Sequence, residues 1–190
     1  MEAARPPIRT WFFVALALTL AWVTYLALFG PSPEAGGLEP PGLAPLDRPI
    51  RTEYAWPLRD LDDKPADFAR FRGRPVLLNL WATWCGPCLE EMPAIANLAA
   101  DPRIKAAGVA VVCVSTDESP EALRRYVAGK PWEMTILRAT SLPREFATKG
   151  IPATFLIAPD GRVVAAQVGS AKWDHPSVVA FLEKLAPPKS

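Results

Sequence analysis

The segment Trp84-Cys85-Gly86-Pro87-Cys88 constrains the fold of this chain most, because it stands where an apolar run gives way to a helical pattern. The run at residues 75–81 (PVLLNLW) predicts a buried strand, and residues 86–100 follow helical spacing with a proline at position 93. Cys85 would then lie at the N-terminal end of a helix, where free backbone N–H groups and the helix dipole favour an anion. That position favours the thiolate, the form of cysteine that attacks disulfides.

Cys88 lies one helical turn after Cys85, so the two thiols face the same side and can close a disulfide. We expect Cys88 to be the more buried and therefore the resolving thiol. Half of a zinc site is an alternative, but it needs a second Cys/His pair, and only Cys113 and His175 remain. A structural disulfide is another, but so short a ring stabilises a fold little. The spacing therefore favours a redox-active pair.

Residues 47–190 have the length of one ordinary domain. Short β-like runs alternate in them with longer helical ones. After the first strand and helix we expect a strand at 108–115, a helix capped by Ser119 that ends near Gly129, a strand at 133–138, a short helix at 142–149, a hairpin at 153–168 and a helix at 176–185. This order predicts an α/β fold with a mixed central sheet flanked by helices.

The N-terminal part of the chain has a different pattern. Residues 11–29 (WFFVALALTLAWVTYLALF) contain no charged side chain, and a helix rising about 1.5 Å per residue would just span a hydrocarbon layer of about 30 Å. This run exceeds the roughly 7–15 apolar residues of a cleaved signal peptide, so we predict a transmembrane anchor. Arg5 and Arg9 precede it and no Lys or Arg follows before Asp47, which places residues 1–10 in the cytoplasm and the domain outside the cell membrane, in the periplasm of a Gram-negative cell.

Composition excludes several functions. The 21 Lys and Arg residues balance 20 Asp and Glu residues, which argues against a protein that coats nucleic acid. The single His argues against a His-rich metal site, and we predict no metal and no other cofactor. Five of the 22 prolines lie in residues 30–46, a density that predicts a linker partly stiffened by polyproline geometry.

Two longer strings carry a family resemblance. NLWATWCGPCLEEMP at residues 79–93 and GIPATFLIAPDGRVV at residues 150–164 resemble the thioredoxin superfamily, and within it the membrane-anchored TlpA/ResA-like branch. The resemblance covers roughly residues 54–186. It implies a thioredoxin-like fold and an extracytoplasmic thiol:disulfide oxidoreductase, several of which serve cytochrome c or cytochrome oxidase assembly. It also implies protein disulfides as substrates and a membrane electron donor that supplies reducing equivalents across the bilayer.

The same resemblance suggests residues that contact the substrate. The family proline that matches Pro152 is cis and packs beside the active disulfide, and Ile151 would offer backbone groups to an incoming extended peptide. Trp84 is expected to be exposed and to shape the contact surface around Cys85, whereas Trp81 is expected in the core.

Glu91 and Asn79 concern proton transfer. Thioredoxin has a buried Asp at the position of Asn79, whose amide cannot exchange a proton near neutral pH. Glu91 lies three residues after Cys88 on the same helix face, and ResA-like proteins have a matching glutamate near the active thiols. We expect Glu91 to relay a proton to or from Cys88. The alternative is an exposed first-turn carboxylate that only favours the helix N-terminus, a role that suits Glu90.

Two other functions are compared with this one. A peroxiredoxin needs Thr or Ser three residues before its peroxidatic cysteine and Pro seven before, where this chain has Ala82 and Leu78. A copper-binding assembly factor of this fold would use Cys85, Cys88 and a His, but such proteins usually have a Cys-x-x-x-Cys pair and a well-placed downstream His.

The remaining cysteine and histidine are expected to be structural. We expect Cys113 to act as a small buried hydrophobe. His175 should pack before the last helix, with Asp174 or a neighbouring group as its cap.

Overall fold

The computed structural model describes residues 8–29, 38–43, 46 and 50–187 of the 190-residue chain. It divides into two units, residues 1–37 and residues 38–190. The predictions for the cytoplasmic N-terminus and the linker fall largely outside the described residues.

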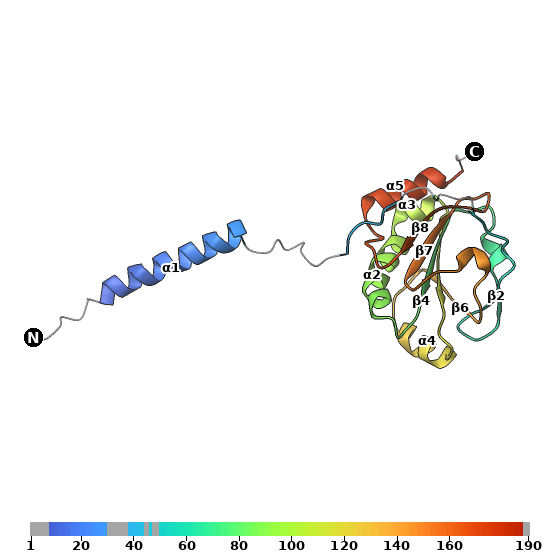
Figure 1. Ribbon diagram of the computed structural model, residues 1–190, viewed down its shortest axis with the longest axis horizontal. Helices are drawn as coiled ribbons and strands as arrows, with labels where there is room; N and C mark the ends of the chain where they lie inside the picture. The colour runs from blue at the N-terminus through green and yellow to red at the C-terminus, as the bar shows by residue number, and fades with distance from the viewer. Residues whose placement is uncertain (1–7, 30–37, 44–45, 47–49, 188–190) are drawn as a thin grey trace, which may run out of the picture. The chain divides into compact units, whose positions relative to one another are not determined.

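The first unit contains one helix, α1 (Ile8–Phe29), shown in blue in Figure 1. Two of its threonines return their hydroxyl hydrogen bonds to the helix itself: Thr19 Oγ1 donates to the Leu16 carbonyl and Thr24 Oγ1 to the Leu20 carbonyl, both at 2.8 Å. Within the part of the chain that the structure describes, no helix reaches the length and apolarity needed to cross a membrane. The helical conformation is confirmed, and the transmembrane span at residues 11–29 stays a prediction.

The second unit is built on one mixed sheet (Figure 1). Its strands are β1 (Ile50–Arg51), β2 (Pro57–Arg59), β3 (Pro65–Asp67), β4 (Val76–Trp81), β5 (Ala110–Ser115), β6 (Thr135–Ala139), β7 (Ala153–Ile157) and β8 (Arg162–Val168). Its helices are α2 (Gly86–Ala100), α3 (Pro102–Ala106), α4 (Pro120–Val127) and α5 (Pro176–Leu185), with 3₁₀ turns η1 (Phe68–Phe71) and η2 (Arg144–Phe146). The strand order is β1-β8-β7-β4-β5-β6-β2-β3, in which β4 and β6 pair parallel to β5 and the other pairs are antiparallel.

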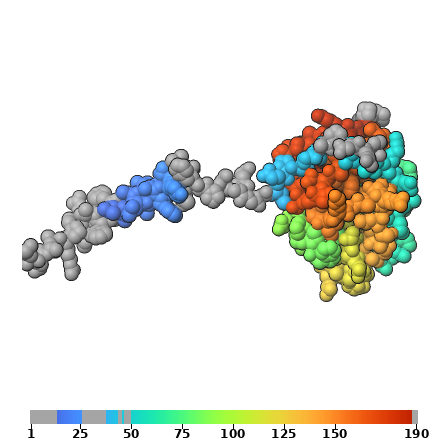
Figure 2. Space-filling model, viewed as in Figure 1, coloured from blue at the N-terminus to red at the C-terminus, as the bar shows by residue number. Residues whose placement is uncertain are grey.

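Strand β4 lies at the centre of this sheet, between β7 and β5, and all six of its residues are buried. Because successive side chains of a strand point to opposite faces, β4 contributes to two separate cores. Leu77 and Trp81 pack with residues of α2, α3, α4 and α5. Leu78 and Leu80 point to the other face and pack with residues of η1 and η2. Figure 2 shows α2 (green) and α4 (yellow) next to each other on the surface of this unit.

Most elements confirm the sequence prediction, with α2 and α5 beginning and ending where their patterns do. Residues 142–149 are a correction, because only the three residues of η2 are helical there. Pro143 precedes this turn and Gly150 follows it closely, so the segment is too short for a helix to nucleate and propagate. Pro93 lies inside α2 and does not end it, since the chain is helical on both sides.

Candidate active site

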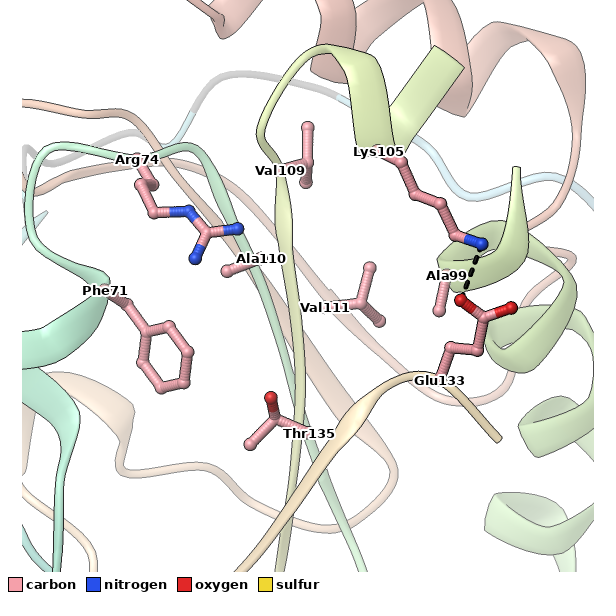
Figure 3. Close-up of a pocket in the computed structure, with 9 residues that line it drawn as sticks. All are labelled: Phe71, Arg74, Ala99, Lys105, Val109, Ala110, Val111, Glu133 and Thr135. Carbon is pink, nitrogen blue, oxygen red and sulfur yellow. Dashed lines mark ion pairs between the residues drawn. The ribbon is translucent and has the colours of Figure 1, made fainter. Parts of the chain in front are cut away.

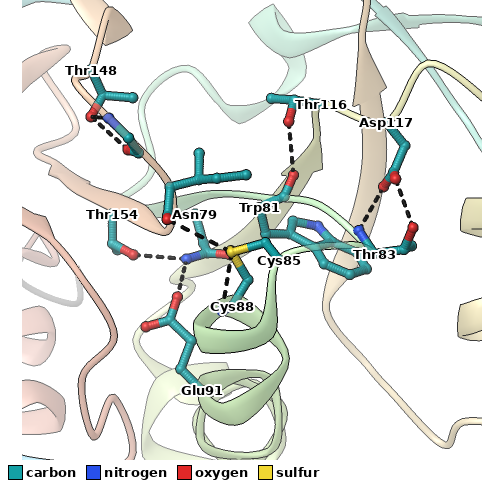
Figure 4. Close-up of a disulfide and its surroundings, with 12 residues drawn as sticks. Asn79, Trp81, Thr83, Cys85, Cys88, Glu91, Thr116, Asp117, Thr148 and Thr154 are labelled. Carbon is teal, nitrogen blue, oxygen red and sulfur yellow. Dashed lines mark hydrogen bonds between the residues drawn. A yellow bond between two sulfur atoms is a disulfide. The ribbon is translucent and has the colours of Figure 1, made fainter.

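Cys85 and Cys88 stand where β4 ends and α2 begins (Figure 4). Cys85 is the N-cap residue of α2, and its Sγ accepts a hydrogen bond from the Cys88 backbone N–H at 3.3 Å. The two sulfurs form a disulfide with an S–S distance of 2.06 Å. After reduction, the same N–H group and the helix dipole would stabilise a thiolate on Cys85.

The two cysteines differ in exposure. Cys88 is completely buried and Cys85 retains 6% of its surface, while the neighbouring Trp84 is 71% exposed. Trp81, in contrast, is buried with its ring against that of Tyr126, at 5.5 Å between centroids. A substrate sulfur can therefore approach Cys85, beside an exposed indole, but not Cys88.

The bond between Ile151 and Pro152 is cis, as expected. The Ile151 carbonyl oxygen lies 3.7 Å from Cys85 Sγ, so this loop borders the disulfide directly. On its far side, the Pro152 carbonyl accepts a hydrogen bond from the Gly169 N–H at 2.9 Å, which joins the loop to the end of β8. The backbone beside Cys85 is thus fixed before any substrate arrives.

Glu91 lies in α2 one turn after Cys88 and is completely buried, so the alternative of an exposed carboxylate is wrong. Its Oε1 accepts a hydrogen bond from Asn79 Nδ2 at 2.7 Å. Its Oε2 accepts from the Ala171 N–H at 3.0 Å and from Trp173 Nε1 at 2.9 Å. Burial raises the pKa of Glu91 above its ordinary value, and the three hydrogen bonds offset only part of that effect.

Trp173 was not expected to contact a site residue. The indole is buried, and its N–H donates a hydrogen bond to Glu91 Oε2. A buried Trp needs a partner for its N–H. Sequence alone did not indicate which one, because the two residues are far apart in the chain.

Asp117 is a second buried carboxylate that the sequence reasoning missed. It accepts hydrogen bonds from the Thr83 N–H at 2.9 Å, from Thr83 Oγ1 at 2.7 Å and from Ser115 Oγ at 2.6 Å. Its own N–H donates to Ser115 Oγ at 2.9 Å. These bonds attach the loop before Cys85 to the end of β5 (Figure 4). A usable signal was the polar Ser-Thr-Asp run after a buried strand, because carboxyl ends of parallel strands meet at one edge of a sheet.

The model of the Redoxin family matches residues 47–182. The chain belongs to the Redoxin family. Thiol-disulfide oxidoreductase ResA of Bacillus cereus is 30% identical to this Redoxin chain over 130 residues, covering 67% of it and 73% of the relative. ResA of Bacillus subtilis is 28% identical over 166 residues, covering 86% and 84%.

Among solved structures, the putative thiol:disulfide interchange protein DsbE from Chlorobium tepidum is 28% identical, with a TM-score of 0.57. The match covers 72% of this Redoxin chain and 94% of the other. Together with the Cys85–Cys88 disulfide, these relatives make the protein a ResA/TlpA-like thiol:disulfide oxidoreductase of the thioredoxin superfamily.

Cys113 and His175 of this Redoxin chain lie where structural roles suit them. Cys113 is a buried free thiol that donates to Met134 Sδ at 3.7 Å, and burial together with the charge of Glu91 raises its pKa. His175, rather than Asp174, caps α5, and its Nδ1 accepts from the Ser177 N–H at 3.3 Å. Among the described residues, no three His, Cys, Asp or Glu side chains are grouped to hold a metal ion.

A pocket of about 320 Å³ lies elsewhere in the domain and shares no residue with the disulfide site (Figure 3). Phe71, Arg74 and Thr135 line it together with Lys105 and Glu133, which form an ion pair at 2.5 Å. Both partners of that pair are about half exposed, so it contributes little to stability.

Proposed function

We propose that this protein is a membrane-tethered, extracytoplasmic reductase of disulfides in client proteins. The observation that carries the proposal is the pairing of a reachable Cys85 at the N-cap of α2 with a completely buried Cys88 in the first turn. This asymmetry gives the two sulfurs different tasks, since only the outer one meets a protein substrate.

The reaction transfers two electrons. The Cys85 thiolate attacks one sulfur of a client disulfide, the client S–S bond breaks, and the departing client thiolate takes a proton. Cys88 then loses its proton and attacks Cys85 Sγ in the mixed disulfide. The second client thiol leaves, and the Cys85–Cys88 disulfide remains until a donor reduces it.

Glu91 acts in the second step as the group that accepts the Cys88 proton. It lies one turn from Cys88 in α2 and is buried, so bulk water does not substitute for it easily. The raised pKa of Glu91 brings the proton affinity of its carboxylate closer to that of the Cys88 thiolate. A general base is most effective when its pKa is matched in this way to its task.

Client binding uses the rim of the site. The exposed indole of Trp84 contacts the client, and the backbone of Ile151 pairs with an extended client segment beside Pro152. Both lie next to Cys85, so the client disulfide is brought to the reachable sulfur.

The N-terminal sequence supports the proposed tethering. The uncharged run of residues 11–29, preceded by Arg5 and Arg9, anchors the domain outside the cytoplasm. Because that side is oxidising, a membrane protein must deliver the reducing equivalents. Proteins of cytochrome c or cytochrome oxidase assembly are the clients we propose.

Recovery of the full-length chain in the membrane pellet after alkaline carbonate washing supports the anchor, and its release into the wash contradicts it.

The decisive test is trapping. In Cys88→Ala the mixed disulfide cannot be resolved, so clients should accumulate on Cys85 and be identifiable by mass spectrometry after non-reducing purification. The double variant Cys85→Ala/Cys88→Ala is the control and should trap nothing. Equal recovery of proteins on both variants contradicts the proposal.

A further inference from the structure

Asn79 is the residue of the site whose hydrogen bonding is incomplete. It lies in the middle of β4, in register with Cys113 of β5 and Thr154 of β7, and is completely buried. Its Nδ2 donates to Glu91 Oε1 at 2.7 Å and to Thr154 Oγ1 at 2.9 Å. Its Oδ1 is buried and has no hydrogen-bond partner among the described residues. Such a group is costly to bury unless it is used in another state of the protein.

The partners of Glu91 suit only one of its two protonation states. All three are N–H donors, which complement an ionised carboxylate. A protonated carboxyl carries an O–H group that needs an acceptor. The Ala171 N–H and the Trp173 indole N–H can only donate, whereas the side-chain amide of Asn79 contains both a donor and an acceptor.

The second partner of Asn79 permits the amide to reverse. Thr154 Oγ1 belongs to a hydroxyl, which accepts from an N–H and donates to a carbonyl equally well. Half a turn of the amide would direct Oδ1 to both Glu91 and Thr154. Both hydrogen bonds would then persist with donor and acceptor exchanged. Oδ1 would gain two partners, and the NH₂ group would take over the buried position that has none among the described residues.

We propose that Asn79 is a positioning residue whose side-chain amide turns over when Glu91 takes up a proton, so that the buried carboxyl keeps this partner in both states. The proposal deepens the proposed function, because it rests on Glu91 cycling between carboxylate and carboxyl during catalysis. Asn79 acts through Glu91 and exchanges no proton itself. This role suits an amide at position 79, because an ionisable side chain there would compete with Glu91 for the proton of Cys88.

Few other ionisable groups face this pair. Cys85 and Cys88 lie on α2, and Cys113 lies on β5. In the segment that supplies Ala171 and Trp173, Lys172 is exposed and Asp174 accepts a hydrogen bond from Asn97 at 3.0 Å. With the disulfide closed, Cys85 and Cys88 do not titrate, and the raised pKa of Cys113 removes it from the acidic and neutral range.

The direct test is nuclear magnetic resonance of the oxidised full-length protein, with the side-chain carboxyl of Glu91 and the side-chain NH₂ of Asn79 followed through one pH titration. We expect the Asn79 NH₂ resonances to shift with the same midpoint as the Glu91 carboxyl. We also expect their nuclear Overhauser contacts to the Thr154 side chain, which Nδ2 approaches to 2.9 Å at Oγ1, to be lost on the acidic side. An Asn79 NH₂ that keeps its shifts and contacts while Glu91 titrates would overturn the proposal.

A variant gives a second, independent readout. If Asn79 were a fixed donor to the carboxylate, its removal in Asn79→Leu would raise the pKa of Glu91 by about one to two units, the strength of a hydrogen bond to a charged group. If Asn79 instead stabilises both the carboxylate and the protonated carboxyl of Glu91, the two effects largely cancel. We then expect Asn79→Leu to change the pKa of Glu91 by less than about 0.5 unit. A larger rise would overturn the proposal.

Thr154→Val is the matched control. It removes the reversible partner and should restrict the amide, so that the Asn79 NH₂ resonances no longer follow Glu91. These readouts need no client, so a failure to trap clients on Cys88→Ala would remove the proposed function and leave this result standing.

Discussion

Glu91 and Asp117 are both buried carboxylates near the two ends of the Cys85–Cys88 segment, since Glu91 follows Cys88 in α2 and Asp117 binds Thr83 before Cys85. Their hydrogen-bond partners differ. Glu91 accepts hydrogen bonds from N–H groups only, one of them from β4 and two from the segment before α5. Asp117 accepts from one N–H and two hydroxyls, all on residues that flank the chain ends of β4 and β5. The partners of Glu91 connect α2 to β4 and to the segment before α5. Asp117 instead connects the loop after β4 to the end of β5.

The difference suggests a division of work. Glu91 follows Cys88 by one turn of α2 and has its pKa raised by burial, which suits a group that exchanges a proton. Asp117 holds Thr83 by both its N–H and its hydroxyl, which fixes the loop that carries Trp84 and Cys85. Four predictions test this division, beginning with the largest effect.

Glu91→Gln should slow release of the client thiol from a preformed Cys85 mixed disulfide by about 10²–10⁴-fold, the usual contribution of a positioned acid or base. Stopped-flow measurement of the released thiol gives the rate. Asp117→Asn is the matched variant and should slow the same step less than about tenfold, because it removes no proton acceptor near Cys88. Equal losses in the two variants would abolish the distinction.

Asp117→Ala should lower the free energy of unfolding by about 2–4 kcal/mol, because it leaves the Thr83 N–H and two hydroxyls without their buried acceptor. Urea denaturation of the oxidised protein measures this change. A loss below about 0.5 kcal/mol, typical of surface positions, would show that Asp117 does not hold the loop.

The stability of the oxidised protein should depend on pH through Glu91. Its pKa is raised in the folded state from an ordinary value of 4.5, so between these two values the folded protein binds more protons than the unfolded chain. The contribution is fully present below pH 4.5 and is lost as pH rises through the raised pKa. Urea titrations across this range should show that fall, and Glu91→Gln should remove it. The same fall in Glu91→Gln would assign it to another group.

The smallest effect concerns the Thr83 hydroxyl. Thr83→Val removes its bond to Asp117 and should cost about 1 kcal/mol of unfolding free energy. Thr83→Ser keeps the hydroxyl and should stay within about 0.5 kcal/mol of the parent protein. Thermal and urea unfolding of both variants measures these changes. A larger loss of stability in Thr83→Ser than in Thr83→Val would contradict the role of the hydroxyl.

The sequence predicted those parts of the molecule whose signals are local. A continuous apolar run identified β4 and β5, and the Cys pair at a helix start located the disulfide. Strands β2 and β3 were missed, because each has three residues and is too short to show a period.

The contacts of the site were predicted less well, because they join distant positions. Glu91 was predicted as a site residue from the sequence, but its partners Ala171 and Trp173 come from the other end of the domain. Asn79 was noted only for lacking an ionisable proton, and its hydrogen bond to Glu91 emerged with the fold. Asp117 was overlooked, because the polar run at the end of β5 becomes informative only when it is combined with the parallel pairing of β5 with β4.

The proton-transfer role of Glu91 is tested most directly by the pH dependence of client release from the Cys85 mixed disulfide, measured in parallel for the parent protein and Glu91→Gln. We expect the parent profile to contain an inflection at the raised pKa of Glu91, and we expect this inflection to be absent from the slower variant. Two profiles of the same shape and the same rate would contradict it.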